Sequence, residues 1–172
     1  MTSDLRTALL AFDGKATSLL SEAAMQHRDT AGYLDDLITL IGDPEGHIGD
    51  GASWLLKARL EMDNRLSSTQ VKSILDRLCM DLNWAAALHV LQSVQHLDPP
   101  PRIDTHVRNA IEHYTQHDRP FLRAWALDAF MRLFGANAEY KTQIALLMDH
   151  AREDPAASVR ARARKLSKEL PI

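Results

Sequence analysis

The sequence has a single cysteine, Cys79, among its 172 residues. One thiol cannot form an intrachain disulfide, so the sequence favours a reducing compartment. The chain also lacks any apolar run close to the roughly 20 residues that a membrane-spanning helix needs. Its N-terminal stretch has Asp4 early and only a short apolar segment at 8–12, which does not resemble a signal peptide. We therefore expect a cytoplasmic location and no membrane partner.

No charge of one sign dominates the chain. Twenty basic and 23 acidic residues leave a net charge of −3, which gives no general reason to expect nucleic acid as a partner. The charge is nevertheless uneven, because residues 29–63 carry eight acids and two bases, whereas residues 156–172 carry five bases and one acid. Segments of opposite charge favour head-to-tail association of chains, so self-association is one partner mode that the sequence suggests.

Alternating strand patterns are absent, and apolar residues recur at helical spacing along the chain. A longer period is superimposed, since steps of 37 residues join Leu37, Ile74, Ile111 and Met148. A fixed period of this length is typical of stacked helix–turn–helix repeats, because one helix pair cannot bury its apolar face alone. We predict an all-α fold, a short right-handed α-solenoid of about four helix pairs with an N-terminal capping helix or helix pair.

The predicted organisation is one repeat domain over residues 1–172, with an N-terminal cap at 1–28. The repeats cover about 29–65, 66–101, 102–137 and 138–172. Their predicted helix pairs are 31–41 with 47–62, 69–79 with 84–97, 103–116 with 121–134, and 139–152 with 156–170. Ser67 and Gln70 have the spacing of a capping box. The proline-rich stretch 98–102 is interpreted as a linker between the second and third repeats rather than between two domains.

Residues 154–166, Asp-Pro-Ala-Ala-Ser-Val-Arg-Ala-Arg-Ala-Arg-Lys-Leu, resemble the second half of a HEAT repeat. That pattern is a turn Asp, then Val-Arg, then Ala and Leu at helical spacing. Residues 118–126 repeat it with one residue fewer before the Leu-Arg pair, and residues 43–48 keep the spacing without the Arg. The resemblance covers about residues 30–170 and is poorest in the second repeat.

The resemblance implies both a structural link and a class of function. In HEAT-like proteins the turn Asp and the Arg bridge neighbouring repeats, and here Asp118 or Asp154 could pair with Arg123 or Arg160. HEAT-like proteins are mostly binding scaffolds. The resemblance therefore says little about the partner, and we predict a non-enzymatic scaffold that binds a protein or peptide on the concave face of the solenoid.

Two features of the sequence are candidates for a metal site or a reactive thiol. His106, His113 and His117 lie at helical spacing on one face, which could hold a zinc ion, but no zinc-protease motif accompanies them. We interpret them as a solvated helix face and predict neither a metal nor another cofactor. Cys79 continues the apolar stripe of Leu75 and Leu82, so we expect it to pack as a small hydrophobic residue.

The three tryptophans, Trp54, Trp84 and Trp125, all lie in second helices, and we expect core packing for each. Base stacking is the alternative. HEAT-like repeats also occur in glycosylases for alkylated DNA, which use aromatic residues and a catalytic Asp, and Trp125 with Asp128 resembles that arrangement distantly. The alternative functions are accordingly a nucleic-acid-binding or alkylation-repair-like HEAT protein, or a HEAT-like lyase subunit.

The predicted binding surface is the centre of the concave face. It is formed by five residues, His89, Ser93, Arg123, Leu127 and Met131. Central apolar positions with a polar rim carry most of the energy of an interface. The helix 121–134 is almost wholly apolar, so it either presents an apolar patch or is buried nearly all round. If it is buried, Leu127 and Met131 belong to the core between the third and fourth repeats.

Overall fold

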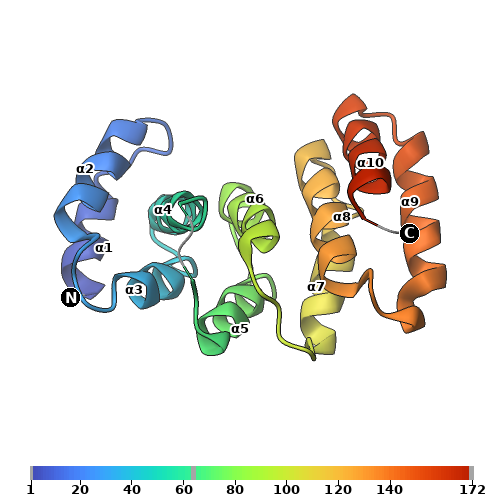
Figure 1. The fold of residues 1–172 in the computed structure, drawn as a ribbon. Helices are drawn as coiled ribbons and strands as arrows, with labels where there is room; N and C mark the ends of the chain where they lie inside the picture. Colours follow the sequence, from blue (N-terminus) through green and yellow to red (C-terminus); the bar gives the residue numbers. More distant parts are fainter. Residues whose placement is uncertain (1, 63–64, 171–172) are drawn as a thin grey trace. The chain divides into compact units, whose positions relative to one another are not determined.

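The computed structural model describes residues 2–62 and 65–170, and every regular element in these ranges is a helix (Figure 1). The α-helices are α1 Thr2–Leu10, α2 Thr17–His27, α3 Tyr33–Leu40, α4 Ile48–Leu60, α5 Ser68–Arg77, α6 Trp84–Ser93, α7 Thr105–Tyr114, α8 Pro120–Phe134, α9 Lys141–Glu153 and α10 Ala157–Glu169. Short 3₁₀ helices follow α6, at Val94–His96, and precede α9, at Ala138–Tyr140. The prediction of an all-α fold is confirmed.

The eight helices of the four predicted pairs are present, each with its ends within four residues of the predicted ones. The residues that carry the 37-residue period, Leu37, Ile74, Ile111 and Met148, lie on α3, α5, α7 and α9 and are all buried. The Ser67 hydroxyl accepts the Gln70 amide N–H, and the Gln70 side chain accepts the Ser67 N–H, so the capping box at the start of α5 is confirmed. The 37-residue period and the capping box therefore predict buried helix positions and a helix start correctly.

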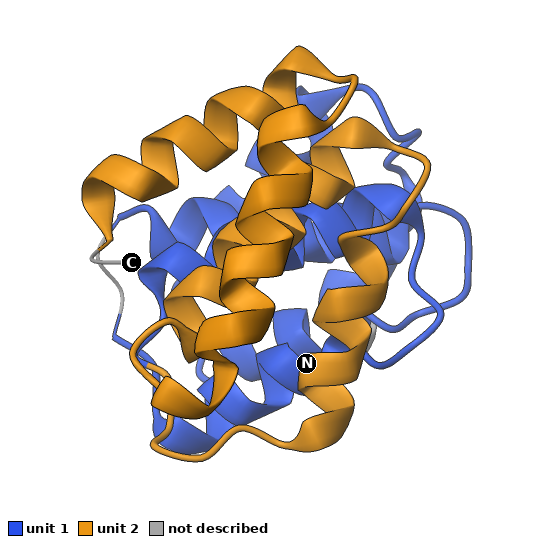
Figure 2. Cartoon of the chain, turned by 90° about the vertical axis from the view of Figure 1, so that its right-hand side faces the viewer, with its two compact units in different colours: residues 1–98 blue, residues 99–172 orange. Residues whose placement is uncertain are grey.

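The chain divides into two compact units, Met1–Asp98 and Pro99–Ile172, which Figure 2 shows in different colours. The division falls at the start of the proline run, where no helix can continue. The assignment of all 172 residues to one repeat domain stays a prediction.

Unit 1 contains α1 to α6. Helix α4 is central, because it contacts α1, α2, α3 and α6, and α5 packs on α3 and α6. Gly51 lets the N-terminal helices approach α4 closely: a Cβ there would lie 2.9 Å from a methyl of Leu20 and 3.2 Å from one of Leu9. The Arg6 guanidinium on α1 donates to Asp43 at 2.7 and 3.2 Å and thereby joins α1 to the turn before α4. The N-terminal helices are thus integral to this core.

Unit 2 contains α7 to α10, and α8 is its central helix, in contact with α7, α9 and α10. Nine of the 15 residues of α8 are buried, including Leu122, Phe130 and Phe134. The rings of Phe130 and Phe134 pack against each other in a tilted arrangement with 4.9 Å between centroids, and Tyr140 meets both rings edge-on. The core of unit 2 is therefore built around one almost wholly apolar helix.

The expectation for Cys79 is wrong, because its side chain is exposed. Helix α5 ends at Arg77, so Cys79 lies beyond the helix and no longer follows its apolar stripe. Leu78 is buried at that end of the stripe instead. Within the described ranges, no helix combines the length and the apolar character that crossing a membrane requires.

Candidate functional site

The exposed apolar patch proposed on helix α8 is not there, because Leu127 and Met131 are each only 2% exposed. Leu127 lies beside Leu147, Ala151 and Val159, at a small cavity of about 90 Å³ within unit 2. The alternative, that these two residues belong to the core, is the one the structure supports. The physical reason is that α8 is surrounded by α7, α9 and α10 and has few polar residues to face water.

Arg123 is engaged in a structural ion pair. Its Nε and Nη2 donate to the two carboxylate oxygens of Asp154, both at 2.8 Å, and its Nη1 donates to the carbonyl oxygens of His117 and Asp118. Hydrogen bonds from Arg123 hold the pKa of the Asp154 carboxyl below its usual value. The ion pair of Arg123 with Asp154 is thus present, and it is one of the Arg–Asp pairings that the resemblance implies. Arg160 donates to the backbone carbonyls of Asp154 and Pro155 instead.

His89 and Ser93 lie on α6 in unit 1, and neither has an exposed side chain. Ser93 is buried and its hydroxyl donates to the His89 carbonyl at 2.8 Å. The His89 ring is partly buried, with Nδ1 3.0 Å from the Ser53 hydroxyl of α4. Because the single Ser53 proton is donated to the Asp50 carbonyl, Nδ1 of His89 must be the donor to Ser53. Burial, with a smaller contribution from Lys57, lowers the pKa of His89 to about 4.

The histidines at 106, 113 and 117 do not form a ligand cluster. His117 lies beyond the end of α7, where its Nδ1 accepts the Arg119 amide N–H at 3.0 Å and its ring stacks on Tyr114. Among residues 2–62 and 65–170, no three His, Cys, Asp or Glu side chains lie close enough together to hold a metal ion.

Core packing does not describe the tryptophans well. Trp84 is exposed at the start of α6, so the expectation is wrong there, while Trp54 and Trp125 are only partly buried. The Arg162 guanidinium lies over the Trp125 ring, 3.6 Å from its centroid. Asp128, one turn further along α8, is 1% exposed and pairs with Arg132 at 2.5 Å and with Arg162 at 3.1 Å. Its carboxylate oxygens are both used within the fold.

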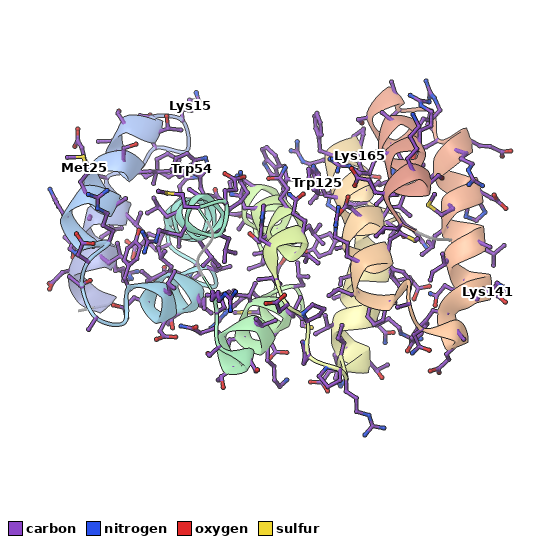
Figure 3. All side chains as sticks on the ribbon, viewed as in Figure 1. Lys15, Met25, Trp54, Trp125, Lys141 and Lys165 are labelled. Carbon is purple, nitrogen blue, oxygen red and sulfur yellow. The ribbon has the colours of Figure 1, made fainter. Side chains whose placement is uncertain are left out.

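The surface feature best suited to binding is an apolar groove in unit 1, between one face of α2 and one face of α4. We call it the α2–α4 groove. It has a volume of about 250 Å³ and is lined by Ser21, Ala24, Met25 and Arg28 of α2, Tyr33 of α3, and Trp54, Leu55, Ala58, Arg59 and Met62 of the α4 segment. Figure 3 labels Met25 and Trp54, which come from these two helices. Met25 is 70% exposed and Met62 is 71% exposed, so the groove places large apolar side chains in water.

Local sequence explains how the groove forms. The residues from α2 are spaced 21, 24, 25 and 28, and those from α4 include 54, 58 and 62, so each set lies on one helix face. Asp13 holds the turn that precedes α2 by accepting the N–H groups of Lys15 and Ala16. Gly32, in the left-handed region at φ +81°, makes the turn after α2 that brings Tyr33 beneath the groove. Tyr33 and Leu55 are buried and form its floor.

The electrostatics of the groove come from two arginines. Its lining includes Arg28 and Arg59 and no carboxylate. The Arg28 side chain is exposed, and its Nε lies 3.7 Å from Asp29, a loose contact in solvent. Burial raises the pKa of Tyr33 to about 12, and the nearby charge of Arg59 opposes this shift. The tyrosine is therefore neutral at physiological pH, and the charged side chains of the lining are both arginines.

Sequence reasoning missed this groove. Met25 and Met62 are separated by the same 37 residues that relate the repeats, and this was the available signal.

No protein-family model, curated protein or solved structure matches this chain. The function is therefore argued from the residues themselves.

Proposed function

We propose that this chain is a non-enzymatic binding module that holds a segment of another protein in the α2–α4 groove. The observation that carries the proposal is the pair Met25 and Met62, which stand about 70% exposed on either side of an apolar floor. Flexible, polarisable methionines are common at surfaces that bind peptides, because they adapt to the partner's side chains. The groove replaces the surface at His89, Ser93, Arg123, Leu127 and Met131 as the proposed site.

The size of the groove supports a side-chain-binding role. Pockets that enclose small molecules usually measure roughly 300–1,000 Å³, whereas this groove measures about 250 Å³ and has largely exposed walls. It suits a few anchoring side chains from a larger partner better than an enclosed ligand.

The proposed architecture is that of a HEAT-like α-solenoid within each unit. Second helices of neighbouring repeats pack on each other, α4 on α6 and α8 on α10, as expected when helix pairs stack. The two-point pair of Arg123 with Asp154 joins neighbouring repeats in the manner that the HEAT resemblance implies. In this proposal α1 and α2 form a degenerate first repeat, and the groove lies between it and the next one.

Selection from a displayed random peptide library tests the proposal. The full chain is immobilised and peptides are enriched against it, then tested on a groove variant, Met25→Asn with Met62→Asn. Both positions are exposed, so the variant should fold normally, and we expect it to lose at least about tenfold in affinity. The matched control is Phe121→Asn with Leu146→Asn, two exposed apolar residues of unit 2. Failure to enrich any peptide that depends on Met25 and Met62 would refute the proposal.

A duplex-DNA titration at low salt addresses the competing nucleic-acid function. Non-specific electrostatic binding is strongest under these conditions, so a nucleic-acid-binding protein should bind at micromolar concentration or below. We expect no such binding, since the net charge of −3 gives the chain no general attraction to phosphate groups. Clear micromolar binding would favour the nucleic-acid alternative.

A further inference from the structure

We infer that the α2–α4 groove selects an acidic amphipathic helix of about two turns. This inference rests on the proposed function and specifies its partner. It is carried by the geometry of the two facing helix rows and by the charges at the edge of the groove.

The length of the groove limits the length of the contact. Its lining extends over residues 21–28 of α2 and 54–62 of the α4 segment. At 1.5 Å per residue, eight helical steps span roughly 12 Å, or about two turns. A partner helix of that length presents apolar side chains at i, i+3 or i+4, and i+7 to the groove. Ala24 and Ala58 leave room for these side chains between the larger Met25, Trp54 and Met62.

The hydrogen bonds that the partner's backbone needs favour a helix over an extended segment. The groove is made of side chains from helices whose own N–H and C=O groups are bonded within the helix. An extended peptide laid on apolar walls would find no strand edge there to satisfy its backbone. A helix satisfies its backbone internally and presents only side chains to the groove.

Charge complementarity gives the sign of the partner. Arg28 and Arg59 are the charged residues of the lining, and no Asp or Glu belongs to it. Because the Arg28 side chain is exposed and only loosely paired, it can turn to a carboxylate on the partner. An acidic residue beside the apolar anchors would meet the Arg28 guanidinium, whereas a lysine would be repelled.

A second copy of this chain is a weaker candidate for the occupant. Helix α3 carries Asp35 and Asp36 in its first turn, but its apolar residues Leu37 and Ile38 are already buried in unit 1. A folded second copy therefore cannot offer this acidic helix to the groove without unfolding it.

The test uses the peptides enriched against the full chain. We expect them to carry net negative charge, to have apolar residues at i, i+3 or i+4, and i+7, and to gain helical circular dichroism on binding. The variant Arg28→Glu with Arg59→Glu should weaken them at least about tenfold and remove much of their salt dependence. The control Arg164→Glu with Lys168→Glu makes the same charge change on exposed positions of α10 and should change affinity less than about twofold.

Two further measurements keep the test decisive if the double variant does not fold. Arg28→Glu alone changes an exposed side chain and should still weaken binding several-fold. Replacing each Glu of the best peptide by Gln leaves the protein unaltered and should weaken binding in the same direction.

The outcomes separate the inference from the proposed function. Enriched peptides that need Met25 and Met62 but are neutral, basic or bound without helix would overturn the inference and leave the binding module intact. A dimer in sedimentation that Met25→Asn with Met62→Asn dissolves would make a second copy the occupant and would also overturn it. If no peptide depends on the two methionines, the proposed function itself fails.

Discussion

Arg123 and Asp154 form a two-point ion pair across 31 residues of sequence, with both nitrogen–oxygen distances at 2.8 Å. Asp154 also accepts the Ala156 N–H that begins the turn into α10, and Arg123 holds two carbonyls of the turn before α8. One guanidinium therefore fastens the starts of both second helices in unit 2. Arg160, which lies 37 residues after Arg123, donates instead to the carbonyl oxygens of Asp154 and Pro155 in the turn before its own helix.

Arg123→Lys should destabilise the chain by about 1–3 kcal/mol, because an ammonium keeps the charge but cannot make the forked bond to a carboxylate. Urea unfolding at neutral pH measures the change as a lower midpoint. Arg164→Lys is the control, since Arg164 is exposed on α10. Equal urea midpoints for the two variants would show that the two-point bond between Arg123 and Asp154 does not contribute to the free energy of unfolding.

Asp128→Asn should cost about 3–5 kcal/mol, because it leaves Arg132 and Arg162 without the buried carboxylate that both contact. The matched control is Asp149→Asn. Asp149 also pairs with an arginine at 2.8 Å, but its side chain is 68% exposed, and exposed pairs contribute only about 0–1 kcal/mol. A thermal melt of both variants compares them. Similar melting temperatures would contradict the role assigned to burial.

Replacing Leu127 and Met131 together by Ser should lower the melting temperature strongly. Both side chains are buried, and each large-to-small change in a core costs about 2–5 kcal/mol, with the hydroxyl adding a penalty of its own. Phe121→Ser with Leu146→Ser removes two exposed apolar side chains from the same unit and should have little effect. A double variant that melted like the wild type would restore these residues as a surface site.

The protein should lose stability as the pH falls from about 6.5 to about 4. The pKa of His89 is lowered to about 4 in the folded state, so between these values the unfolded chain binds more protons, and stability rises with pH. His89→Gln keeps a hydrogen-bond donor toward Ser53. This variant should lose the contribution of His89 to the pH dependence of the free energy of unfolding, which is on the order of 2 kcal/mol. The charge of nearby Lys57 favours the neutral form of the His89 ring, whereas the charge of Asp50 favours the protonated form.

Urea unfolding at pH 7.5 and pH 5 gives the difference between His89→Gln and the wild type. His113→Gln is the control, since His113 is exposed on α7. If the two variants had the same pH dependence, the environment of His89 would not be responsible for it.

The helices were predictable because their signals are local. Apolar spacing and the capping box at Ser67 act within one helix, and the recurrence from Leu37 to Met148 repeats the same local pattern at a buried position of four helices. Local spacing fails at Cys79, which the apolar stripe predicts to be buried. Helix α5 ends at Arg77, two residues before Cys79, so the helical spacing no longer applies and the side chain is exposed.

The faces of the helices were harder to assign. An apolar helix such as α8 carries no marker of which side meets solvent, so Leu127 and Met131 were equally compatible with a surface and a core. Trp84 and Met25 illustrate the opposite case, since both are large apolar residues that the fold leaves in water. Exposure depends on how many neighbours surround a helix, and this number is a property of the packing.

The sequence by itself determined the all-α class, the positions of the four predicted helix pairs and the residues that carry the period. Only the tertiary structure decided that Arg123 is bound to Asp154, that Asp128 is held by two arginines, and that Met25 and Met62 flank one groove. The reason is that helix formation depends on neighbours three and four residues away, whereas these features bring together segments that are distant in the sequence; Asp128, for example, meets Arg162 of α10. The contacts between helices depend on how those helices pack.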